Sequence, residues 1–276
     1  DALSNFAAKL IPTALLFFPT LHAFVQRVEA RPRIKKWLSS KESLEIPFLA
    51  PKADSRCSYH SFASLHSCYR KSTIRIVCLH GGGSNTAIMA YQLRQLRKMM
   101  GDNASFTYFA GGREWSDPPD PGIPEDLVNM DALQGWYGVH ITGTSPTVEQ
   151  IADPKARFQY SDVDLAIKRV CDFCEKEGPF DVAIGFSQGA TLLTMLHVEH
   201  TLPGCRLIVL IAGLPPRDDA YKVKHKLSVP CTIMYGKCDP FYSACCELKE
   251  SYSNALVYEH DMGHVPPNKC VSFALA

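Results

Sequence analysis

The sequence lacks an excess of charge of either sign. It has 29 lysine and arginine residues against 28 aspartate and glutamate residues, which gives a formal net charge of +1. No extended basic patch interrupts this balance, so the sequence lacks the electrostatic footprint of a nucleic-acid-binding protein. Repeats at the periods of solenoid proteins are also absent, which excludes a repeat architecture.

Long hydrophobic runs are missing as well. The most apolar stretch, LIPTALLFFPTLHAFV, contains Pro12 and Pro19. It is also shorter than the roughly 20 residues that a membrane-spanning helix needs. It has no clear cleavage site of the kind that ends a signal peptide. The stretch therefore favours a packed helix, and no membrane span is predicted.

Cysteines are numerous but lack the spacing of a metal site. The eleven cysteines are odd in number and scattered, and only Cys171 with Cys174 and Cys245 with Cys246 lie close together. No second pair stands at zinc-ribbon spacing, so no metal is predicted. Free, mostly buried thiols in a reducing compartment fit this pattern better than disulfides do, which predicts a cytoplasmic protein.

The segment FDVAIGFSQGA, residues 180–190, is the strongest chemical signal in the chain. It places Ser187 in a G-x-S-x-G pattern, with an apolar run before it and leucines at helical spacing after it. Strand, sharp turn and helix in this order project a nucleophilic serine from the carboxyl end of a buried strand. The pattern also arises by chance. Without partners, Ser187 is therefore either a nucleophile or a hydroxyl in a glycine-rich turn.

Partners occur in the order nucleophile, acid, base. Asp239 follows the apolar run CTIMYG and His264 follows ALVYEH, so each lies just past a predicted strand. Alone, Asp239 before a proline is typical of a helix cap, and a histidine near a chain end is typical of the surface. Their joint placement favours a triad with Ser187. His260 and Asp261 compete for these roles, but they lie within or at the edge of a predicted strand, which ranks them lower.

The glycine loop predicts an oxyanion hole. In IRIVCLHGGGSN a strand is followed by His80 and three glycines. No Lys-Ser or Lys-Thr pair follows these glycines and no G-x-G-x-x-G spacing occurs, so no phosphate, dinucleotide or other cofactor is predicted. The alternative is a flexible turn. We expect the backbone amides of Gly82 and Gln188 to stabilise the negative oxygen of a tetrahedral intermediate.

Residues 111–154 are rich in proline, aspartate and glycine and are predicted to form a long irregular insertion. Loops of this length inside a compact domain are usually functional or disordered. Trp136 and Tyr137, in WYGVHITG, are candidates for the wall of an acyl pocket, because aromatic faces bury acyl chains well. The alternative is that these rings pin the loop to the body of the protein.

Strands and helices alternate along the rest of the chain. Strands are predicted at residues 74–79 and 105–110 and in CRLIVLIAG, PCTIMYG and ALVYEH, and helices near residues 87–100 and 162–176. This alternation predicts an α/β fold with a mostly parallel central sheet and helices on both faces. A chain of 276 residues that is 46% hydrophobic is long enough for one such domain and some extra sequence.

Four segments in this order, CLHGGGSN, GPFDVAIGFSQGA, YGKCDP and GHVPP, resemble the FSH family of serine hydrolases, small α/β-hydrolases with little or no lid domain. The resemblance runs from about Ile74 to near the end of the chain. It implies an α/β-hydrolase fold, a triad of Ser187, Asp239 and His264, and hydrolysis of carboxylic esters or thioesters. The chain departs from the family pattern in its all-glycine loop and in YFAGGREWSDPPDPG. Both border the expected acyl site, so the departures bear on substrate preference.

The amino-terminal part has a different character. The segment FPTLHAFVQRVEARPRIKKWLSSKE is amphipathic and basic, and it resembles the last helices of a glutathione transferase carboxyl-terminal domain. We expect a helical segment at residues 1–43, a linker at 44–73 and the hydrolase domain at 74–276. No thioredoxin-like half precedes the segment, so glutathione binding is not carried over. Because the chain starts at Asp1, we expect a fragment of a longer fusion.

The predicted function is hydrolysis of a small acyl ester or thioester through an acyl-enzyme on Ser187, without metal or cofactor. Two alternatives stay open. One is a non-catalytic binding module with the same fold, and the other is an acyltransferase that delivers the acyl group to an alcohol or amine instead of water. The acyl chain, the leaving group and the oligomeric state are not assigned by the sequence.

Overall fold

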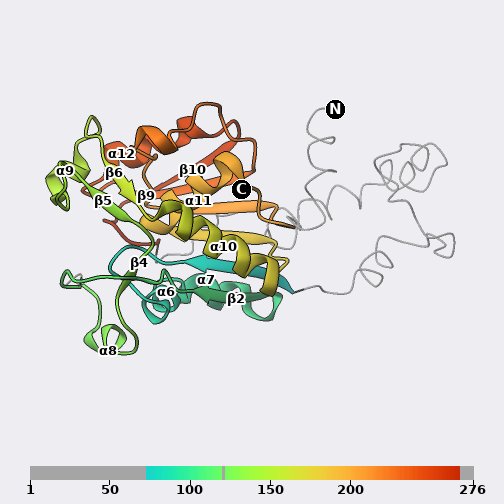
Figure 1. The fold of residues 1–276 in the computed structure, drawn as a ribbon. Helices are drawn as coiled ribbons and strands as arrows, with labels where there is room; N and C mark the ends of the chain where they lie inside the picture. Colours follow the sequence, from blue (N-terminus) through green and yellow to red (C-terminus); the bar gives the residue numbers. More distant parts are fainter. Residues whose placement is uncertain (1–72, 120–121, 268–276) are drawn as a thin grey trace, which may run out of the picture. The chain divides into compact units, whose positions relative to one another are not determined.

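The structure, a computed structural model, describes residues 73–119 and 122–267 (Figure 1). The predicted transferase-like segment and all but the last residue of the predicted linker lie outside the described residues. The central strands are β1 (Ile74–Leu79), β2 (Ala104–Phe109), β7 (Val182–Phe186), β8 (Leu207–Ile211), β9 (Cys231–Gly236) and β10 (Ala255–His260).

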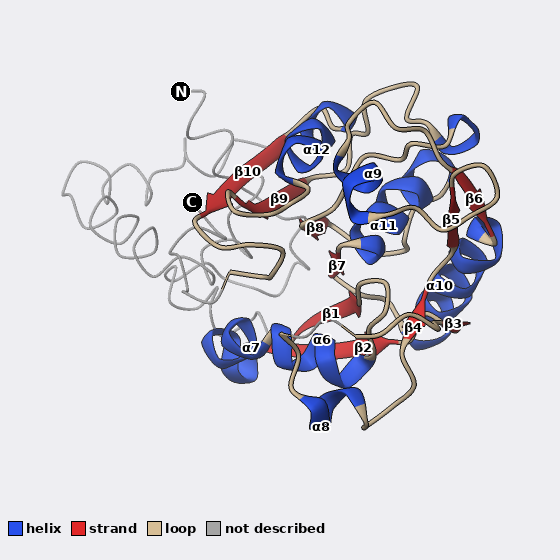
Figure 2. Ribbon diagram, turned by 90° about the vertical axis from the view of Figure 1, so that its left-hand side faces the viewer, coloured by secondary structure: helices blue, strands red, loops and turns tan. Residues whose placement is uncertain are grey.

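Within the described residues these strands form one six-stranded sheet in the order β10-β9-β8-β7-β1-β2 (Figure 2). All neighbouring strands in it are parallel. Parallel strands that are covered on both faces are apolar throughout, not alternating. The sequence CTIMYG of β9 is buried at every position, as this rule requires, whereas β2 and β10 at the two edges are more exposed.

Helices cover both faces of the sheet. The α-helices that connect central strands are α6 (Thr86–Gln92), α7 (Arg94–Met100), α10 (Val163–Glu177), α11 (Gln188–Glu199) and α12 (Tyr242–Glu247), and short 3-10 helices are η2 (Gly101–Asn103), η3 (Asp219–Tyr221) and η4 (Leu248–Ser251). Crossovers between parallel strands are right-handed. The path from β1 through α6 and α7 to β2 and the path from β7 through α11 to β8 run in opposite directions, so these helices lie on opposite faces. The predicted fold class is confirmed.

Helix α11 lies at the centre of the hydrophobic core on one face of the sheet. It packs against β7 and β8 and beside α10 (Figure 2). Residues 189–196 are all buried, including Leu192, Leu193 and Leu196. A helix that is apolar on all sides is a buried helix. Packing on every side fixes the position of its first residues, which follow Ser187 directly.

The sheet reverses its winding direction between β1 and β7. From β1 the chain moves outward to β2, then returns to the other side of β1 and continues from β7 to β10. In open α/β sheets, ligands bind outside the carboxyl ends of the strands at such a switch point. The glycine loop follows β1 and Ser187 follows β7, so both lie there.

The predicted helix near residues 87–100 is two helices. Helix α6 ends at Gln92 and α7 begins at Arg94. Leu93 between them has φ −89° and ψ 8°, which is not helical. Its side chain is only 2% exposed. The bend therefore occurs at a buried apolar residue, where the hydrophobic pattern continues without interruption and gives no signal of a break.

The predicted irregular insertion at residues 111–154 contains regular structure, which corrects that prediction. Its elements are β3 (Arg113–Glu114), α8 (Glu125–Val128), β4 (Gln134–Gly135), β5 (Gly138–His140) and α9 (Val148–Ala152). Strands β3 and β4 pair with each other, and β5 pairs with β6 (Gln159–Ser161), beyond the insertion. Strands of two or three residues are too short to show a period in the sequence.

Candidate active site

Ser187 lies in a sharp turn between β7 and α11. Its φ is 51° and its ψ is −116°, a left-handed backbone conformation that residues other than glycine rarely adopt. Such strain persists only where the surroundings fix the backbone. The Ser187 N–H donates to the carbonyl of Ile211 at the end of β8, at 2.8 Å. The turn is therefore held by the neighbouring strand.

The glycine that follows Ser187 in the motif has a packing reason. A Cβ atom on Gly189 would lie 2.6 Å from the backbone oxygens of both Leu79 and His80. Backbone atoms at the end of β1 have no room to move aside. Glycine at this position therefore allows the start of α11 to approach the glycine loop closely.

His264 connects Ser187 to Asp239. Its Nε2 lies 2.9 Å from Oγ of Ser187, and its Nδ1 lies 2.8 Å from Oδ2 of Asp239. A carboxylate only accepts hydrogen bonds, so Nδ1 carries the ring proton and Nε2 is left to accept from the serine hydroxyl. The Asp239 side chain is fully buried, whereas 21% of the His264 side chain is exposed. The structure brings these three predicted residues together.

The Asp239 carboxylate is itself held in place. Its Oδ1 accepts from the N–H of Phe241 at 2.8 Å. Helix α12 begins at Tyr242 with Phe241 as its N-cap residue, so Asp239 is not the N-cap, which was the alternative interpretation. The rings of Phe241 and Phe186 lie 5.1 and 5.2 Å from that of His264. Two aromatic contacts and one carboxylate therefore restrict the orientation of the imidazole.

The competing residues His260 and Asp261 make other contacts. Nδ1 of His260 accepts from the N–H of Met262 at 3.3 Å, and burial lowers the pKa of this ring. The carboxylate of Asp261 forms an exposed ion pair with Lys237 at 2.9 Å. Within the described residues, neither of the two hydrogen-bonds to Ser187 or His264.

Gly82 and Gln188, the residues predicted to supply the oxyanion hole, line the same cavity as Ser187 and His264. Gln188 is the first residue of α11, where a backbone N–H has no partner within the helix. In the part of the chain that the structure describes, no hydrogen-bond acceptor is found for the backbone N–H of either residue. Both amides are therefore available to a ligand.

His80 holds the glycine loop, a role that the sequence analysis missed. Its Nδ1 donates to the carbonyl of Gly81 at 2.6 Å, and its Nε2 accepts from the N–H of Gly111 at 2.9 Å. Burial lowers the pKa of His80 to about 4, so the ring is neutral near pH 7, as one donor and one acceptor require. The signal in the sequence was a histidine placed between an apolar strand and three glycines.

The side chain of Gln188 ties the insertion to the start of α11. Its Oε1 accepts from the N–H of Trp136 at 2.8 Å, and its Nε2 donates to the carbonyl of Tyr137 at 2.9 Å. From the sequence, Gln188 was predicted to contribute only its backbone amide. The amide side chain fixes the segment that follows β4.

Trp136 and Tyr137 were both candidates for the pocket wall, and the structure separates them. Tyr137 lines the cavity. Trp136 does not: its side chain is 2% exposed, and its Nε1 donates to the carbonyl of His80 at 2.7 Å. Its ring packs 5.8 Å from that of Phe109. Trp136 therefore pins the insertion to the body, which was the alternative interpretation for this residue.

The cavity beside Ser187 has a volume of about 460 Å³. Pockets of about 300–1,000 Å³ are typical for small organic ligands. Apolar and aromatic side chains of the insertion form much of its wall, and Arg113, Glu114, Asp117 and Arg217 are the charged residues on it. The residues that surround it are Gly82, Arg113–Asp117, Tyr137–His140, Ser145, Pro146, Val148, Ile151, Phe158, Tyr160, Ser187, Gln188, Thr191, Leu214, Pro215, Arg217, Phe241 and His264.

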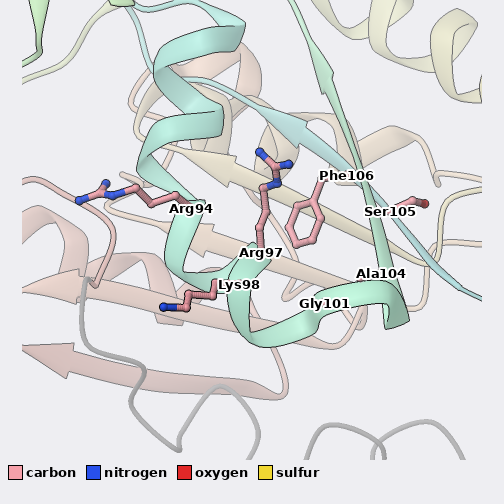
Figure 3. A pocket seen from close by; sticks show the side chains of 7 residues that line it. All are labelled: Arg94, Arg97, Lys98, Gly101, Ala104, Ser105 and Phe106. Carbon is pink, nitrogen blue, oxygen red and sulfur yellow. The ribbon is translucent and has the colours of Figure 1, made fainter.

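A second hollow lies between α7 and β2. Figure 3 shows Arg97 of α7 beside Phe106 of β2, and Arg94 and Lys98 on the same helix. This hollow has a volume of about 480 Å³ and shares no residue with the cavity at Ser187. It brings together basic side chains without a histidine or a carboxylate, so it offers no acid–base chemistry.

Metal and disulfide chemistry find no support in the described part of the chain. Within residues 73–119 and 122–267, no group of three or more histidine, cysteine, aspartate or glutamate side chains could hold a metal ion. The cysteines of these ranges are free thiols.

No helix of the described residues is both long enough and apolar enough to cross a bilayer. The predicted cytoplasmic location stays a prediction.

Two family models match the chain. The model described as Serine hydrolase (FSH1) matches residues 70–272, which is most of the chain. The model described as Glutathione S-transferase, C-terminal domain, matches residues 1–41. Both resemblances seen in the sequence are confirmed at this level.

Several individual relatives are named esterase or hydrolase. The chain is 30% identical to the esterase FPY3 of Fusarium mangiferae over 215 residues, which cover 70% of this chain and 88% of that protein. It is 25% identical to the human esterase OVCA2, with 70% and 89% covered. Among solved structures, a carboxylesterase from Mesorhizobium loti matches with 20% identity and a TM-score of 0.46, covering 71% of this chain and 84% of that chain.

Proposed function

The chain belongs to the serine hydrolase (FSH1) family, and it is a serine hydrolase of the esterase type with the α/β-hydrolase fold. From this premise we propose that Ser187 is the nucleophile, His264 the general base and Asp239 the residue that orients His264. The observation that carries this proposal is the pair of hydrogen bonds that joins the three side chains, at 2.9 and 2.8 Å. Nucleophile, base and orienting acid in hydrogen-bond reach are what acyl transfer requires.

Acylation follows from the tautomer of His264. Nε2 takes the proton from the Ser187 hydroxyl as Oγ attacks the carbonyl carbon of the substrate. Asp239, which is hydrogen-bonded to Nδ1 of His264, stabilises the imidazolium that forms. The tetrahedral intermediate then expels the leaving group, which receives the proton from Nε2. The products of this half-reaction are an acyl-enzyme on Ser187 and a free alcohol or thiol.

The oxyanion of the intermediate needs donors that are already in place. We assign this role to the backbone amides of Gly82 and Gln188, two residues that line the same cavity as Ser187. One such donor contributes about 10²- to 10³-fold to turnover. His80 and the side chain of Gln188 act as positioning groups for these amides, because they hold the glycine loop and the segment at Trp136. Deacylation repeats the sequence with water in place of the serine hydroxyl.

We propose carboxylic esters as the substrate class, with thioesters of the same acyl groups as a second class. The names of the relatives support esters. Thioesters differ only in the leaving atom, and the acyl-enzyme is the same. We also keep the division into a transferase-like segment at 1–43, a linker at 44–73 and a hydrolase domain at 74–276 as a proposal.

The experiment is a steady-state assay on 4-nitrophenyl esters of increasing acyl length and on matched acyl thioesters. We expect Ser187→Ala to lower kcat/KM by at least about 10³-fold on every active substrate. Ser243→Ala removes an exposed hydroxyl on α12 outside the cavity and serves as the matched control, with wild-type rates expected. Equal activity of Ser187→Ala and the wild type would refute the assignment.

A further inference from the structure

Arg217 is a buried cation on the wall of the cavity that holds Ser187. It lies in the loop after β8, directly after two prolines. It is only 5% exposed, yet it lines the cavity together with Ser187 and His264. Arginine is rarely buried to this extent without a charged partner. Arg217 was not among the site residues predicted from the sequence.

The guanidinium uses one of its nitrogens for structure. Nη1 donates to the carbonyls of Ile151 and Asp153 at 2.9 and 2.8 Å, which fixes the end of α9. The backbone of Arg217 also holds the insertion, because its N–H donates to the hydroxyl of Tyr160 and its carbonyl accepts from the N–H of Phe158. These contacts account for the burial of the residue and for its position.

The other two nitrogens have no such role. Nε and Nη2 are buried and have no hydrogen-bond acceptor within the described residues. These two N–H groups lie in the guanidinium plane along the same edge of the group, and together they match the two oxygens of a carboxylate. The residue that carries this unpaired donor pair lines the same cavity as Ser187.

The positive charge of Arg217 also lacks a partner at ion-pair distance. Among the described residues, no carboxylate lies within 4.0 Å of its guanidinium. Burial is the main influence on its pKa and lowers it, while Tyr160, Glu247 and Asp153 act in the opposite direction and Arg157 adds a like charge. A buried charge without a paired counter-charge is costly. An anion in the cavity would remove that cost.

The other arginine on the cavity wall is already paired. Arg113 lies 2.5 Å from the carboxylate of Asp162, and both side chains are substantially exposed. The acidic residues of the wall, Glu114 and Asp117, are exposed to solvent. Arg217 is therefore the charged side chain of this wall that combines burial with unused donors.

We propose that Arg217 binds a carboxylate carried by the substrate, so that the enzyme selects esters that have a free acid group in addition to the reacting ester. This rests on the proposed function of Ser187. Nε and Nη2 are buried in the structure, so binding requires that they become accessible from the cavity. The acid group does not take part in the bond changes. It holds the ester in register with Ser187 through two charge-assisted hydrogen bonds.

The test compares kcat/KM for matched acidic and neutral esters in the full chain. The first pair is mono-4-nitrophenyl glutarate and 4-nitrophenyl pentanoate, which places the acid on the acyl part. The second pair is 4-acetoxybenzoate and its methyl ester, assayed at the acetyl group, which places it on the leaving group. We expect the wild type to prefer the acidic member of at least one pair. Arg217→Met and Arg217→Lys should each lower that preference about 10- to 100-fold, since a hydrogen-bonded charge pair contributes about that much.

Arg157→Met is the matched control, because it removes a positive charge near Arg217 from an exposed side chain that does not line the cavity. We expect it to retain the wild-type preference. No preference for the acid in either pair, or a preference that survives in both Arg217 variants, would overturn the proposal while the esterase function stands.

A binding measurement separates this proposal from the function of Ser187. Calorimetric titration of glutarate into wild type and Arg217→Met does not depend on turnover. If Arg217→Met fails to fold, Arg217→Lys takes its place, since it retains the charge but lacks the pair of donors. Binding to the wild type that weakens at least tenfold in the variant supports the proposal even without activity on any ester. Equal affinity or absence of binding in the wild type refutes it.

Discussion

Nε2 of His264 lies 2.9 Å from Oγ of Ser187, although 77 residues separate the two in the chain. The two residues follow strands that are not neighbours, since β9 and β8 lie between β10 and β7. The loop after β10 therefore reaches across the carboxyl ends of the sheet, and Asp239 in the loop after β9 holds the imidazole on its other side. The site depends on three loops that each follow a strand of the parallel sheet.

Replacing Asp239 by asparagine should impair catalysis and leave the fold intact. An amide can donate to Nδ1 of His264 and so stabilises the wrong ring tautomer, with Nε2 protonated. We expect kcat to fall by about 10³- to 10⁴-fold. Asp261→Asn is the matched control, because that carboxylate pairs with Lys237 at the surface. Equal losses in the two variants, with circular dichroism spectra unchanged, would contradict the choice of Asp239.

Trp136 should matter for stability more than for substrate choice. Trp136→Ala removes a side chain that is 2% exposed and should lower the free energy of unfolding by about 3–5 kcal/mol. Trp136→Phe removes the hydrogen bond to the His80 carbonyl, at a cost of about 1 kcal/mol. Urea unfolding and rates on acetyl and octanoyl esters check both. A tenfold change in the ratio of these rates for Trp136→Phe would show that Trp136 contacts the acyl chain.

His80 should make the protein sensitive to acid. Burial lowers its pKa from 6.5 to about 4, so between these values the unfolded chain binds more protons than the folded chain. The contribution of His80 is complete above pH 6.5 and is lost as the pH falls to about 4, with a total loss of about 3 kcal/mol. Urea unfolding at pH 7 and pH 4.5 measures this loss.

The same measurement on His80→Gln shows how much of the acid-induced loss of stability comes from His80. Glutamine can accept and donate as the neutral ring does, but it does not titrate, so its stability should fall less on acidification. The exposed His200 provides the control, and His200→Gln should lose as much stability as the wild type. An identical loss for His80→Gln and the wild type would assign the acid sensitivity to other groups.

Gly189→Ala should disturb the nucleophile through the backbone. The added Cβ would meet the carbonyl oxygens of Leu79 and His80 at 2.6 Å, which forces α11 away from the end of β1. We expect a loss of about 1–3 kcal/mol in stability and a fall in kcat/KM on neutral esters. Val198→Ala, at the exposed end of the same helix, should change neither. Full activity in Gly189→Ala would show that the close approach is not needed.

The central strands and the longer helices could be predicted because the pattern of apolar residues that indicates them lies within one short segment of the sequence. The apolar run at residues 74–79 coincides with β1, and the predicted helix at 162–176 is α10, shifted by one residue. Three candidate residues at strand ends could be paired because the carboxyl ends of parallel strands converge. Two facts were sufficient to predict the triad. Each candidate follows the carboxyl end of a strand, and serine, aspartate and histidine are the residue types that a triad needs.

Other parts depend on contacts between distant segments. Strand β5 has three residues and exists because β6 pairs with it, and the two-residue strands β3 and β4 hold each other. The amide of Gln188 binds the backbone at Trp136 and Tyr137, which lie about fifty residues away in sequence. Arg217 belongs to no motif, and only the fold shows that it borders the cavity. None of these relationships leaves a periodic trace in the sequence.

The central claim is that Ser187 is an activated nucleophile, and labelling with a fluorophosphonate probe tests it most directly. The purified full chain and Ser187→Ala are treated side by side, and the modified peptide is mapped by mass spectrometry. We expect one modified residue, Ser187, and no label in the variant. A folded wild-type protein that stays unlabelled, or a label on another residue that persists in Ser187→Ala, would contradict it.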